Sequence, residues 1–378
     1  MSGKTANGAG LRGQVAGTTA LCTVGQAGSG LSYRGYDIET LAERASFEEV
    51  AWLLLKDSLP TRAELDAYII KLKGLRGLPA ELRATLERIP AHAHPMDVMR
   101  TGCSLLGNLE TEANFSQQDE AADRLLAALP SIICYWYAHS HEGRRLDDEA
   151  LAAPDTDSIG GHFLHMLHGG APDDLFQEVM NASLILYAEH EFNASTFTAR
   201  VVASTLSDLH SCVTAAIGAL RGPLHGGANE AAMAMIEQWR SPEEAERGVL
   251  AMLERKEKVM GFGHAIYRES DPRTAIIKGW AEKLSRLVGD TVLYPVSVRC
   301  EEVMWREKRL FCNADFFHAS AYHFMGIPTK LFTPIFVMSR LTGWAAHVKE
   351  QRANNRIIRP SAEYDGPASA EWVDIADR

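Results

Sequence analysis

Apolar residues recur at three- and four-residue spacing along most of this chain, and this repeat constrains the fold more than any other feature of the sequence. The segments with this spacing are residues 121–137, 175–187, 198–220, 274–287, 316–325 and 335–348. Capping boxes, in which Ser or Thr is followed three residues later by Glu, predict further helix starts at Ser46, Thr61 and Ser241. Residues 176–187 and 192–217 are apolar around much of their circumference, which is typical of helices deep inside a helical domain or at an obligate interface.

Alternation of apolar and polar residues, the pattern of a half-buried strand, is scarce in the chain. The best example is residues 18–23, which a Gly-rich turn separates from residues 31–33. This arrangement predicts one small hairpin near the N-terminus. The fold class that we expect is therefore all-α, with at most this marginal β element and an extended arm after Pro360.

The charge of the chain narrows the classes of partner. Its 38 Lys and Arg residues and 49 Asp and Glu residues give a net charge of −11, whereas a nucleic-acid surface would show a basic excess. A few arginines can still create a positive pocket for an anionic small molecule. No apolar run approaches the roughly 20 residues that span a bilayer, so we expect no membrane partner.

Six cysteines are scattered along the chain, and no two of them have CxxC spacing. This pattern argues against a structural zinc site and against a disulfide framework. The first 13 residues lack the apolar stretch of a signal peptide. We therefore expect reduced, mostly buried thiols in a cytoplasmic protein.

Two motifs are compatible with a cofactor or a metal, although both have a simpler interpretation. Residues 8–13 match the GxGxxG dinucleotide pattern, but no predicted strand precedes them and no helix follows, which favours a flexible tail. His162, His165 and His168 are spaced so that two imidazoles could share a helix face in a metal-dependent hydrolase. Because no HExxH motif or acidic partner completes that set, packing or surface histidines are favoured.

Three short segments carry more specific chemistry. His225 stands among small residues in GPLHGGANE, where backbone amides and a ligand can approach the imidazole closely. His264 stands between glycine and alanine in GFGHAIYR, and Asp-Pro-Arg follows at 271–273. Asp315 stands beside two aromatic residues at the start of an apolar helix. Taken singly, the three are as readily explained as a turn histidine, a loop histidine and an N-cap.

Together and in this order, the three segments resemble the citrate synthase family, and the resemblance covers nearly the whole chain. The family patterns GPxHGGANE and GFGHxxY followed by DPR are matched at 222–230 and 261–273. Residues 189–196, EHEFNAST, match the family's substrate-histidine helix. The resemblance implies the condensation of an acyl-CoA with oxaloacetate, without a metal and without a permanently bound cofactor.

The resemblance also implies a fold of two helical domains. The large domain would comprise residues 1–225 and 331–378 and hold most of a homodimer interface. The small domain, residues 226–330, would close over the substrates. Closure of this kind excludes water and assembles residues from both domains.

Three residues are implied to carry the chemistry. Asp315 would be the general base that removes a proton from the α-carbon of the thioester. His225 would donate a hydrogen bond to the thioester oxygen, where negative charge develops. His264 would polarise the ketone of oxaloacetate and then protonate its oxygen.

Oxaloacetate has two carboxylates, and planar arginine forks bind such groups with directional hydrogen bonds. The residues implied to bind it are His190, Arg273, Arg340 and Arg359. Of these, Arg359 would be given to the site across the dimer interface. The site is therefore expected to contain residues of both subunits.

The sequence departs from the family pattern at two places. Many members carry Pro-Val or Arg-Val after the second histidine, and Ala265-Ile266 stands there in this chain. A contact to CoA phosphate must then come from elsewhere, and the candidates are Lys256, Lys258 and Arg268. Ala314 precedes Asp315, where a larger side chain is usual, which would slightly change the size of the pocket.

The acyl group is the remaining choice. Residues 33–38, 94–101, 157–165 and 357–362 look like those of family members that use propionyl-CoA, and acetyl-CoA is the alternative. Since one methylene is worth only about 1–3 kcal/mol in a pocket, we expect activity on both thioesters. The alternative from another functional class is a non-catalytic helical dimer that uses this fold for binding or regulation.

Overall fold

A computed structural model describes residues 14–26 and 30–378. Seventeen α-helices, three short 3-10 helices and one three-stranded sheet make up the regular structure of these ranges, which confirms the all-α prediction. The GxGxxG motif at 8–13 lies outside the described residues. None of the helices within these ranges combines the length and the apolarity that a bilayer crossing needs.

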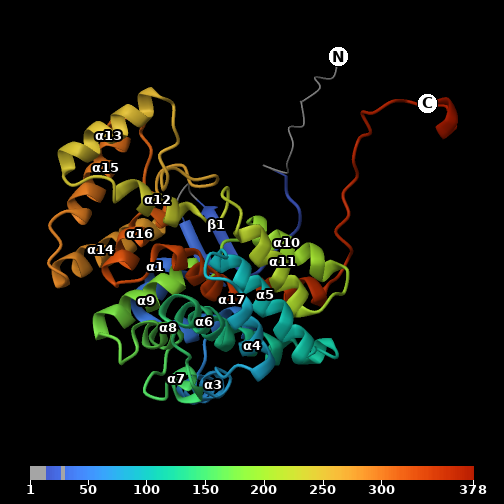
Figure 1. Ribbon diagram of the computed structural model, residues 1–378, viewed down its shortest axis with the longest axis horizontal. Helices are drawn as coiled ribbons and strands as arrows, with labels where there is room; N and C mark the ends of the chain where they lie inside the picture. The colour runs from blue at the N-terminus through green and yellow to red at the C-terminus, as the bar shows by residue number, and fades with distance from the viewer. Residues whose placement is uncertain (1–13, 27–29) are drawn as a thin grey trace.

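The elements follow one another along the chain as shown by the colours of Figure 1. The strands are β1 (Cys22–Gln26), β2 (Gly30–Tyr33) and β3 (Tyr36–Asp37). The first helices are α1 (Ile38–Arg44), α2 (Phe47–Lys56), α3 (Arg62–Gly74), α4 (Ala80–Arg88), α5 (Pro95–Leu109), α6 (Gln118–Glu142), α7 (Asp148–Ala152) and α8 (Ile159–His168). The later helices are α9 (Asp174–Tyr187), α10 (Ala194–Ser204), α11 (Leu209–Leu220), α12 (Ala228–Ile236), α13 (Pro242–Glu254), α14 (Pro272–Leu287), α15 (Leu293–Lys308), α16 (Ala314–Phe324) and α17 (Phe332–Ala353).

The expected capping boxes begin three of these helices, and two of the boxes are complete. Ser46 and Thr61 each accept a bond from the amide of the Glu three residues on, and that Glu accepts the amide of the cap in return. Ser241 accepts the amide of Glu244, whose carboxylate instead binds the amide of Arg240. The third box is therefore half formed, and Pro242 supplies the helical φ of the first turn.

The N-terminal sheet is confirmed, but its first strand begins later than the alternating pattern predicts. Cys22 of β1 pairs with Tyr33 of β2, and a short β3 adds a third strand. The residues before Cys22 bind a helix rather than a strand, because Thr19 Oγ1 and the Ala20 amide both donate to Glu350 of α17. These bonds to α17 take the place of strand pairing before Cys22.

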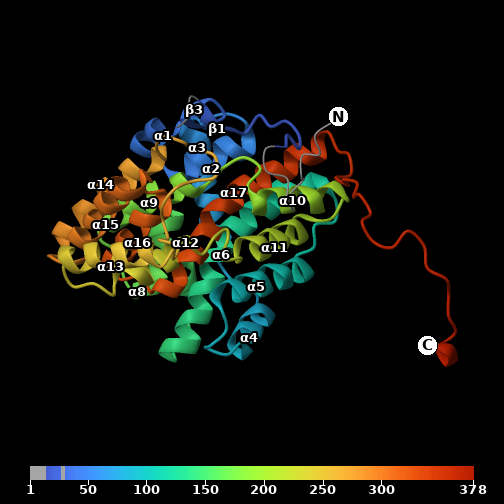
Figure 2. The same cartoon turned by 90° about the horizontal axis from the view of Figure 1, so that it is seen from above.

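Two long helices form the centre of the molecule. In α6 and α17 the buried side chains cover most of the circumference, and Trp136 and Trp344 are fully buried. Helix α17 contacts α2, α6, α9, α10 and α11 (Figures 1 and 2). The apolar segment 192–217 is broken into α10 and α11, because Leu206 adopts a left-handed conformation and Asp208 caps a new helix.

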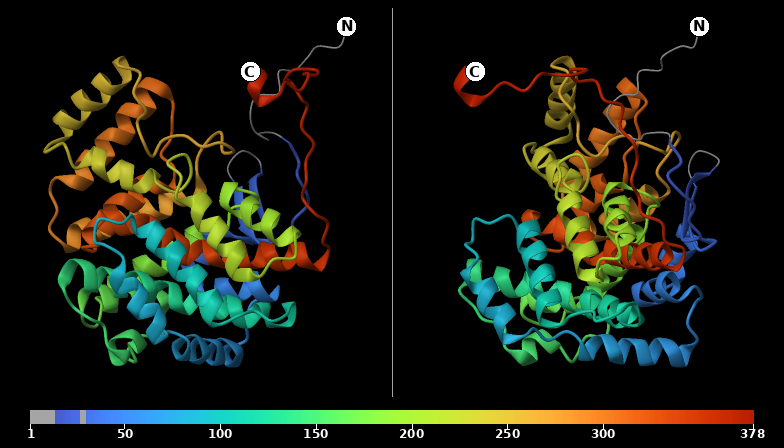
Figure 3. Two further views of the ribbon diagram at one scale, coloured as in Figure 1. Left: turned by 45° about the vertical axis from the view of Figure 1, so that its right-hand side comes forward. Right: turned by 90° about the vertical axis from the view of Figure 1, so that its right-hand side faces the viewer.

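Helices α12 to α16 pack mainly on one another, through the pairs α14–α16, α13–α15 and α12–α16. They form the yellow and orange group at the upper left of Figure 1, and they meet the remaining helices where α14 contacts α9 and α12 contacts α17. The division of the chain at residues 226 and 330, and any movement there, stays a prediction. The residues from 359 onwards are all exposed and run away from the helices as an arm (Figure 3).

Candidate active site

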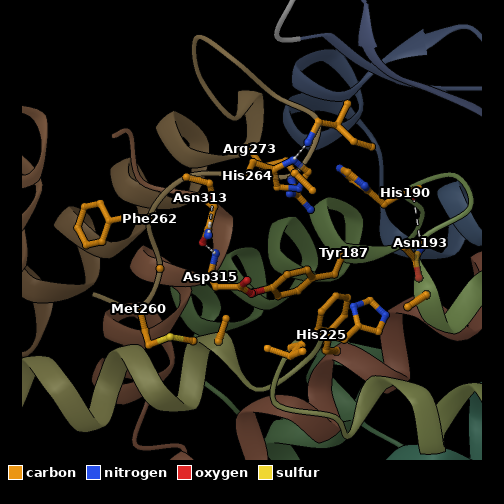
Figure 4. A pocket seen from close by; sticks show the side chains of 18 of the residues that line it. Tyr187, His190, Asn193, His225, Met260, Phe262, His264, Arg273, Asn313 and Asp315 are labelled. Atoms are coloured by element: carbon orange, nitrogen blue, oxygen red, sulfur yellow. Dashed lines mark hydrogen bonds between the residues drawn. The ribbon is translucent and has the colours of Figure 1, made fainter. Parts of the chain in front are cut away.

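A cavity of about 790 Å³ lies where α9, α10 and α17 face the loop before α14 and the start of α16 (Figure 4). The residues of the predicted site that line it are His190, His225, Lys258, His264, Arg273, Asp315 and Arg340. They come from sequence positions up to 150 residues apart, so the fold brings together what the motifs only suggest. Arg359 is exposed on the C-terminal arm and does not reach this cavity.

His264 is held by its own loop. Gly261 and Gly263 adopt left-handed backbone conformations, with φ of 86° and 72°, and a Cβ on Gly261 would lie only 2.8 Å from the ring of Phe316. The Nδ1 atom of His264 accepts the backbone amides of Ile266 and Tyr267 at 3.1 and 3.2 Å. The ring proton therefore resides on Nε2 in the neutral imidazole. Burial and the nearby charge of Arg273 lower the pKa of His264 to about 4, which keeps it neutral at pH 7.

His225 is held by a helix distant in sequence. The backbone amide of Ser195, in the first turn of α10, donates to His225 Nε2 at 3.2 Å, and Ser195 Oγ lies 2.8 Å from the same nitrogen. An accepting Nε2 leaves the proton on Nδ1. Burial and the charge of Arg340 lower the pKa of His225 to about 4. The positive end of the α10 dipole also favours the neutral ring.

Asp315 lies in the first turn of α16, and its half-buried side chain lines the cavity. The hydroxyl of Tyr187, the last residue of α9, donates to Asp315 Oδ1 at 2.5 Å, and Figure 4 shows the two side chains pointing towards one another. Burial raises the pKa of the Asp315 carboxyl, while the Tyr187 hydrogen bond and Arg273 act in the opposite direction. A raised pKa makes this carboxylate a stronger base than a solvated aspartate.

Asn313 fastens the His264 loop to the start of α16. Its Nδ2 donates to Gly263 O at 3.0 Å, its amide donates to Gly261 O at 2.9 Å, and its Oδ1 accepts the amide of Asp315 at 3.1 Å. Asn313 therefore sets the relative position of His264 and Asp315, which are 51 residues apart in the sequence. Asn313 is not among the residues predicted from the sequence, although Asn before a helix is a familiar N-cap signal.

The two arginines of the cavity are bound differently. Arg273 forms a bidentate pair with Asp271, with Nε–Oδ1 and Nη2–Oδ2 distances of 2.9 and 2.7 Å, which leaves Nη1 for another partner. Arg340 donates from Nε to Tyr187 O at 2.6 Å, and its Cζ lies 4.7 Å from the centre of the Phe336 ring. Within the described ranges the Nη atoms of Arg340 have no hydrogen-bond partner. Both guanidinium groups are almost fully buried and can bind a carboxylate out of water.

His190 is buried between these groups. Its Nε2 lies 3.0 Å from the hydroxyl of Tyr267, and its ring centre lies 5.1 Å from that of His264. Burial and the charge of Arg273 lower the pKa of His190 well below its ordinary value, so that the ring is neutral. Tyr267 therefore joins two histidines of the site, one by its hydroxyl and the other by its amide.

Sequence reasoning missed Tyr187, Ser195, Tyr267 and Asn313 as site residues. Ser195 and Tyr267 stand inside the quoted motifs, so their position was visible but their contacts were not. Tyr187 ends an apolar helix and looks like a core residue in the sequence. Only the tertiary contact with α16 distinguishes it.

The three candidates for CoA binding do not lie together in one cavity. Lys258 lines the cavity, whereas Arg268 lines a neighbouring cavity of about 530 Å³ that residues 14–17 also line. Lys256 is exposed and lines neither. These roles stay predictions.

The three histidines at 162–168 lie on α8, away from this cavity. His162 is buried, and its Nε2 lies 2.8 Å from Leu151 O, which is the environment of a packing histidine. Among the residues that the structure describes, no group of three His, Cys, Asp or Glu side chains is placed to hold a metal ion. The six cysteines are all buried and free.

The chemistry that this arrangement permits follows from its proton positions. A half-buried carboxylate can accept a proton from a weak acid, and two neutral imidazoles can donate from Nδ1 and Nε2 to oxygen atoms on which charge develops. Two buried guanidinium groups can hold an anionic second substrate beside them. The set suits enolisation of a carbonyl compound followed by addition to a second carbonyl.

Comparisons with a family model, with curated proteins and with solved structures all point to the same protein family. Residues 10–361 match the family model described as "Citrate synthase, C-terminal domain". The chain is 68% identical to the 2-methylcitrate synthase of Shewanella oneidensis over 99% of both chains, and 43% identical to citrate synthase 2 of Bacillus subtilis over 98% of both. A solved citrate synthase from Thermoplasma acidophilum, in ternary complex with carboxymethyl coenzyme A and oxaloacetate, superposes with a TM-score of 0.88 at 32% identity, over 97% of this chain and 98% of that one.

Proposed function

The chain belongs to the citrate synthase family, and we propose that it condenses propionyl-CoA with oxaloacetate and water to give 2-methylcitrate and CoA, with side activity on acetyl-CoA. It is an acyltransferase of the condensing type. The observation that carries the choice of propionyl-CoA is the full-length likeness to the Shewanella oneidensis 2-methylcitrate synthase, at an identity well above that to the Bacillus subtilis citrate synthase.

The reaction begins with the thioester, a weak carbon acid. Asp315 removes a proton from the α-carbon, and the electron pair of the broken C–H bond moves onto the thioester oxygen. The Nδ1–H of His225 donates to that oxygen and stabilises the enol, since the α10 amide already occupies Nε2. This division of the two ring nitrogens supports His225 as the donor.

The enol carbon then attacks the ketone of oxaloacetate. The Nε2–H of His264 polarises the ketone and transfers its proton to the new alkoxide, because Nδ1 is held as an acceptor by two amides. Arg273, Arg340 and His190 hold the oxaloacetate so that its ketone faces the enol. Hydrolysis of the resulting acyl-CoA releases CoA and makes the condensation irreversible.

Arg359 completes the oxaloacetate site from a second subunit in a homodimer. What supports this is the charge inventory of one subunit, in which Asp271 already neutralises Arg273 and only Arg340, of the two cavity arginines, has no carboxylate partner. Two substrate carboxylates need more positive charge than that.

We propose a cytoplasmic location for the enzyme, and the free cysteines support it.

Hybrid dimers test the shared site. Arg359→Ala and His264→Ala subunits are each expected to be inactive as homodimers. A co-refolded equal mixture should recover roughly one quarter of wild-type activity, because each hybrid has one intact site and one with both lesions. A mixture that stays inactive would assign Arg359 to its own subunit or to no site.

The segment 226–330 closes over the substrates after oxaloacetate binds. Support comes from the position of the cavity, which lies between this segment and α9, α10 and α17. Small-angle scattering should show a more compact particle with oxaloacetate than without it. No compaction at saturating oxaloacetate would contradict this order.

Steady-state kinetics with the two thioesters test the proposed substrate. We expect a higher kcat/KM for propionyl-CoA, measured as CoA release with oxaloacetate at saturation. The expected discrimination is modest, roughly 10- to 100-fold, because it depends on one methylene. A kcat/KM at least tenfold higher for acetyl-CoA would instead establish a citrate synthase.

A further inference from the structure

Tyr187 is held in the site by ring stacking and by its main chain. Its ring lies between His318 of α16 and Phe336 of α17, with centroid distances of 4.2 Å on both sides and interplanar angles of 28° and 26°. Its backbone carbonyl accepts Arg340 Nε. With both faces stacked and the main chain bonded, the direction of its hydroxyl is set before any substrate binds.

That hydroxyl is directed at one oxygen of Asp315, at 2.5 Å. In the described ranges no other side chain donates a hydrogen bond to this carboxylate. The neighbouring candidates are engaged elsewhere, since Tyr322 bonds to Ser183 and His318 Nδ1 bonds to Ala314 O. The contact is therefore specific to Tyr187 rather than one of several alternatives.

We propose that Tyr187 is a positioning residue that holds Asp315 Oδ1, so that Oδ2 alone faces the α-carbon of the thioester. The inference rests on the proposed function and adds a residue to its first step. Proton transfer depends steeply on the distance and angle between donor and acceptor, and a carboxylate free to rotate about χ2 presents either oxygen. The hydroxyl removes that freedom.

The proton inventory of the step balances. The α-carbon loses its proton to Asp315 Oδ2, and the electron pair moves to the thioester oxygen beside His225. Tyr187 keeps its own proton throughout, because burial and the Asp315 charge raise its pKa well above the ordinary value. It donates to Oδ1 of both the carboxylate and the acid, and more strongly to the carboxylate.

The charged and titratable groups that face Asp315 come from three other elements as well as its own. They are Tyr187 on α9, Asp271 and Arg273 around the start of α14, Arg340 on α17, and His318 and Tyr322 on α16. Only Tyr187 among them bonds to the carboxylate directly. Removing its hydroxyl should therefore raise the pKa of Asp315 without disturbing the arginines.

The test is Tyr187→Phe, which keeps the ring stack and the carbonyl that binds Arg340. With propionyl-CoA, we expect kcat/KM to fall 10- to 100-fold and its acidic limb to move about one pH unit upwards. KM for oxaloacetate should stay within twofold of wild type. The matched control is Tyr322→Phe, which removes a buried tyrosine hydroxyl bonded to Ser183 and should leave the acidic limb in place.

An acidic limb that does not move, or that moves equally in the control, would overturn the proposal. Wild-type turnover separates this outcome from failure of the proposed function, which would appear as no condensation of propionyl-CoA by the unaltered enzyme. If Tyr187→Phe does not fold, the pH profile of kcat/KM can be measured instead with 3-fluorotyrosine placed at position 187. Its hydroxyl is a stronger donor, so the limb should move to lower pH, and an unmoved limb would again refute the proposal.

Discussion

The two walls of the cavity hold their functional side chains by different means. The loop wall consists of residues 258–273 and 311–315, and its bonds are mostly local: His264 accepts the amides two and three residues on, and Arg273 pairs with Asp271. The helix wall consists of residues 187–195, 225 and 336–340. There His225 is held by Ser195 and Arg340 by Tyr187, across 30 and 153 residues of sequence.

The difference teaches which part of a site a motif can encode. A Gly-rich loop determines the tautomer of its own histidine, because the donors follow within three residues. In the helix wall, the positions of the functional side chains are determined only once the helices are packed together. Mutations should therefore act through local geometry in one wall and through packing in the other.

The largest effect is expected where the walls meet, at Asp315. Asp315→Ala removes the proposed general base and should reduce kcat roughly 10³- to 10⁴-fold. Binding of oxaloacetate should persist, because its ligands lie on other residues, and calorimetry of the variant would check this. Full CoA release by the variant would refute the mechanism for either thioester.

His225→Ala should reduce kcat somewhat less, because it removes one proposed hydrogen-bond donor to the thioester oxygen. We expect kcat to fall about 10²- to 10³-fold. Ser195→Ala is the comparison that probes the helix wall, since it deletes Oγ but keeps the amide that bonds Nε2. Its kcat should fall roughly tenfold or less, and a loss as large as that of His225→Ala would mean that the hydroxyl, not the amide, holds the ring.

Gly343→Ala tests how tightly the helix wall is packed. A Cβ there would lie 2.1 Å from Glu189 Oε2 and 2.5 Å from Ala188 O, beside His190. We expect the free energy of unfolding to fall by about 3 kcal/mol, measured by urea denaturation.

The matched control for this packing test is Gly279→Ala on α14, where a Cβ would meet no atom within 4 Å. That variant should gain up to about 1 kcal/mol from helix propensity. Equal effects of the two substitutions would show that the helix wall is no less tolerant than α14.

The smallest effect concerns protonation of the two histidines. His264 has a pKa of about 4 in the folded protein and an ordinary value of 6.5, so the unfolded chain binds the proton first as pH falls. The free energy of unfolding should therefore decrease between pH 6.5 and 4 and be constant with respect to this group above pH 6.5.

His264→Gln should remove roughly 1–2 kcal/mol of the difference in unfolding free energy between pH 7 and pH 5, after allowance for its partial exposure. His225→Gln should remove a similar share, because burial lowers the pKa of His225 to about 4 as well. Urea denaturation of both variants at the two pH values would measure this. A pH dependence unchanged in both would mean that neither ring is held neutral.

Much of the fold and the centre of the site could be predicted from the sequence. Helical spacing and capping residues indicated an all-α protein, and seven of the ten candidate residues taken from the motifs line one cavity in the structure, while their roles stay predictions. The late start of β1 could not be foreseen, because it depends on Glu350 of α17 binding residues 19 and 20. Tyr187 was missed for the same physical reason, since an aromatic residue that ends an apolar helix has no signature of its partner.

Two hydrogen bonds cross directly from wall to wall, one from Tyr187 to Asp315 and one between His190 and Tyr267. Each joins a residue that handles a proton or a substrate to a tyrosine of the opposite side. Were the walls to part, the base and the substrate histidine would lose these partners at the same moment. If a thioester arrived while the walls were apart, the proposed base would be misaligned, so these two bonds would link removal of the α-proton to assembly of the cavity.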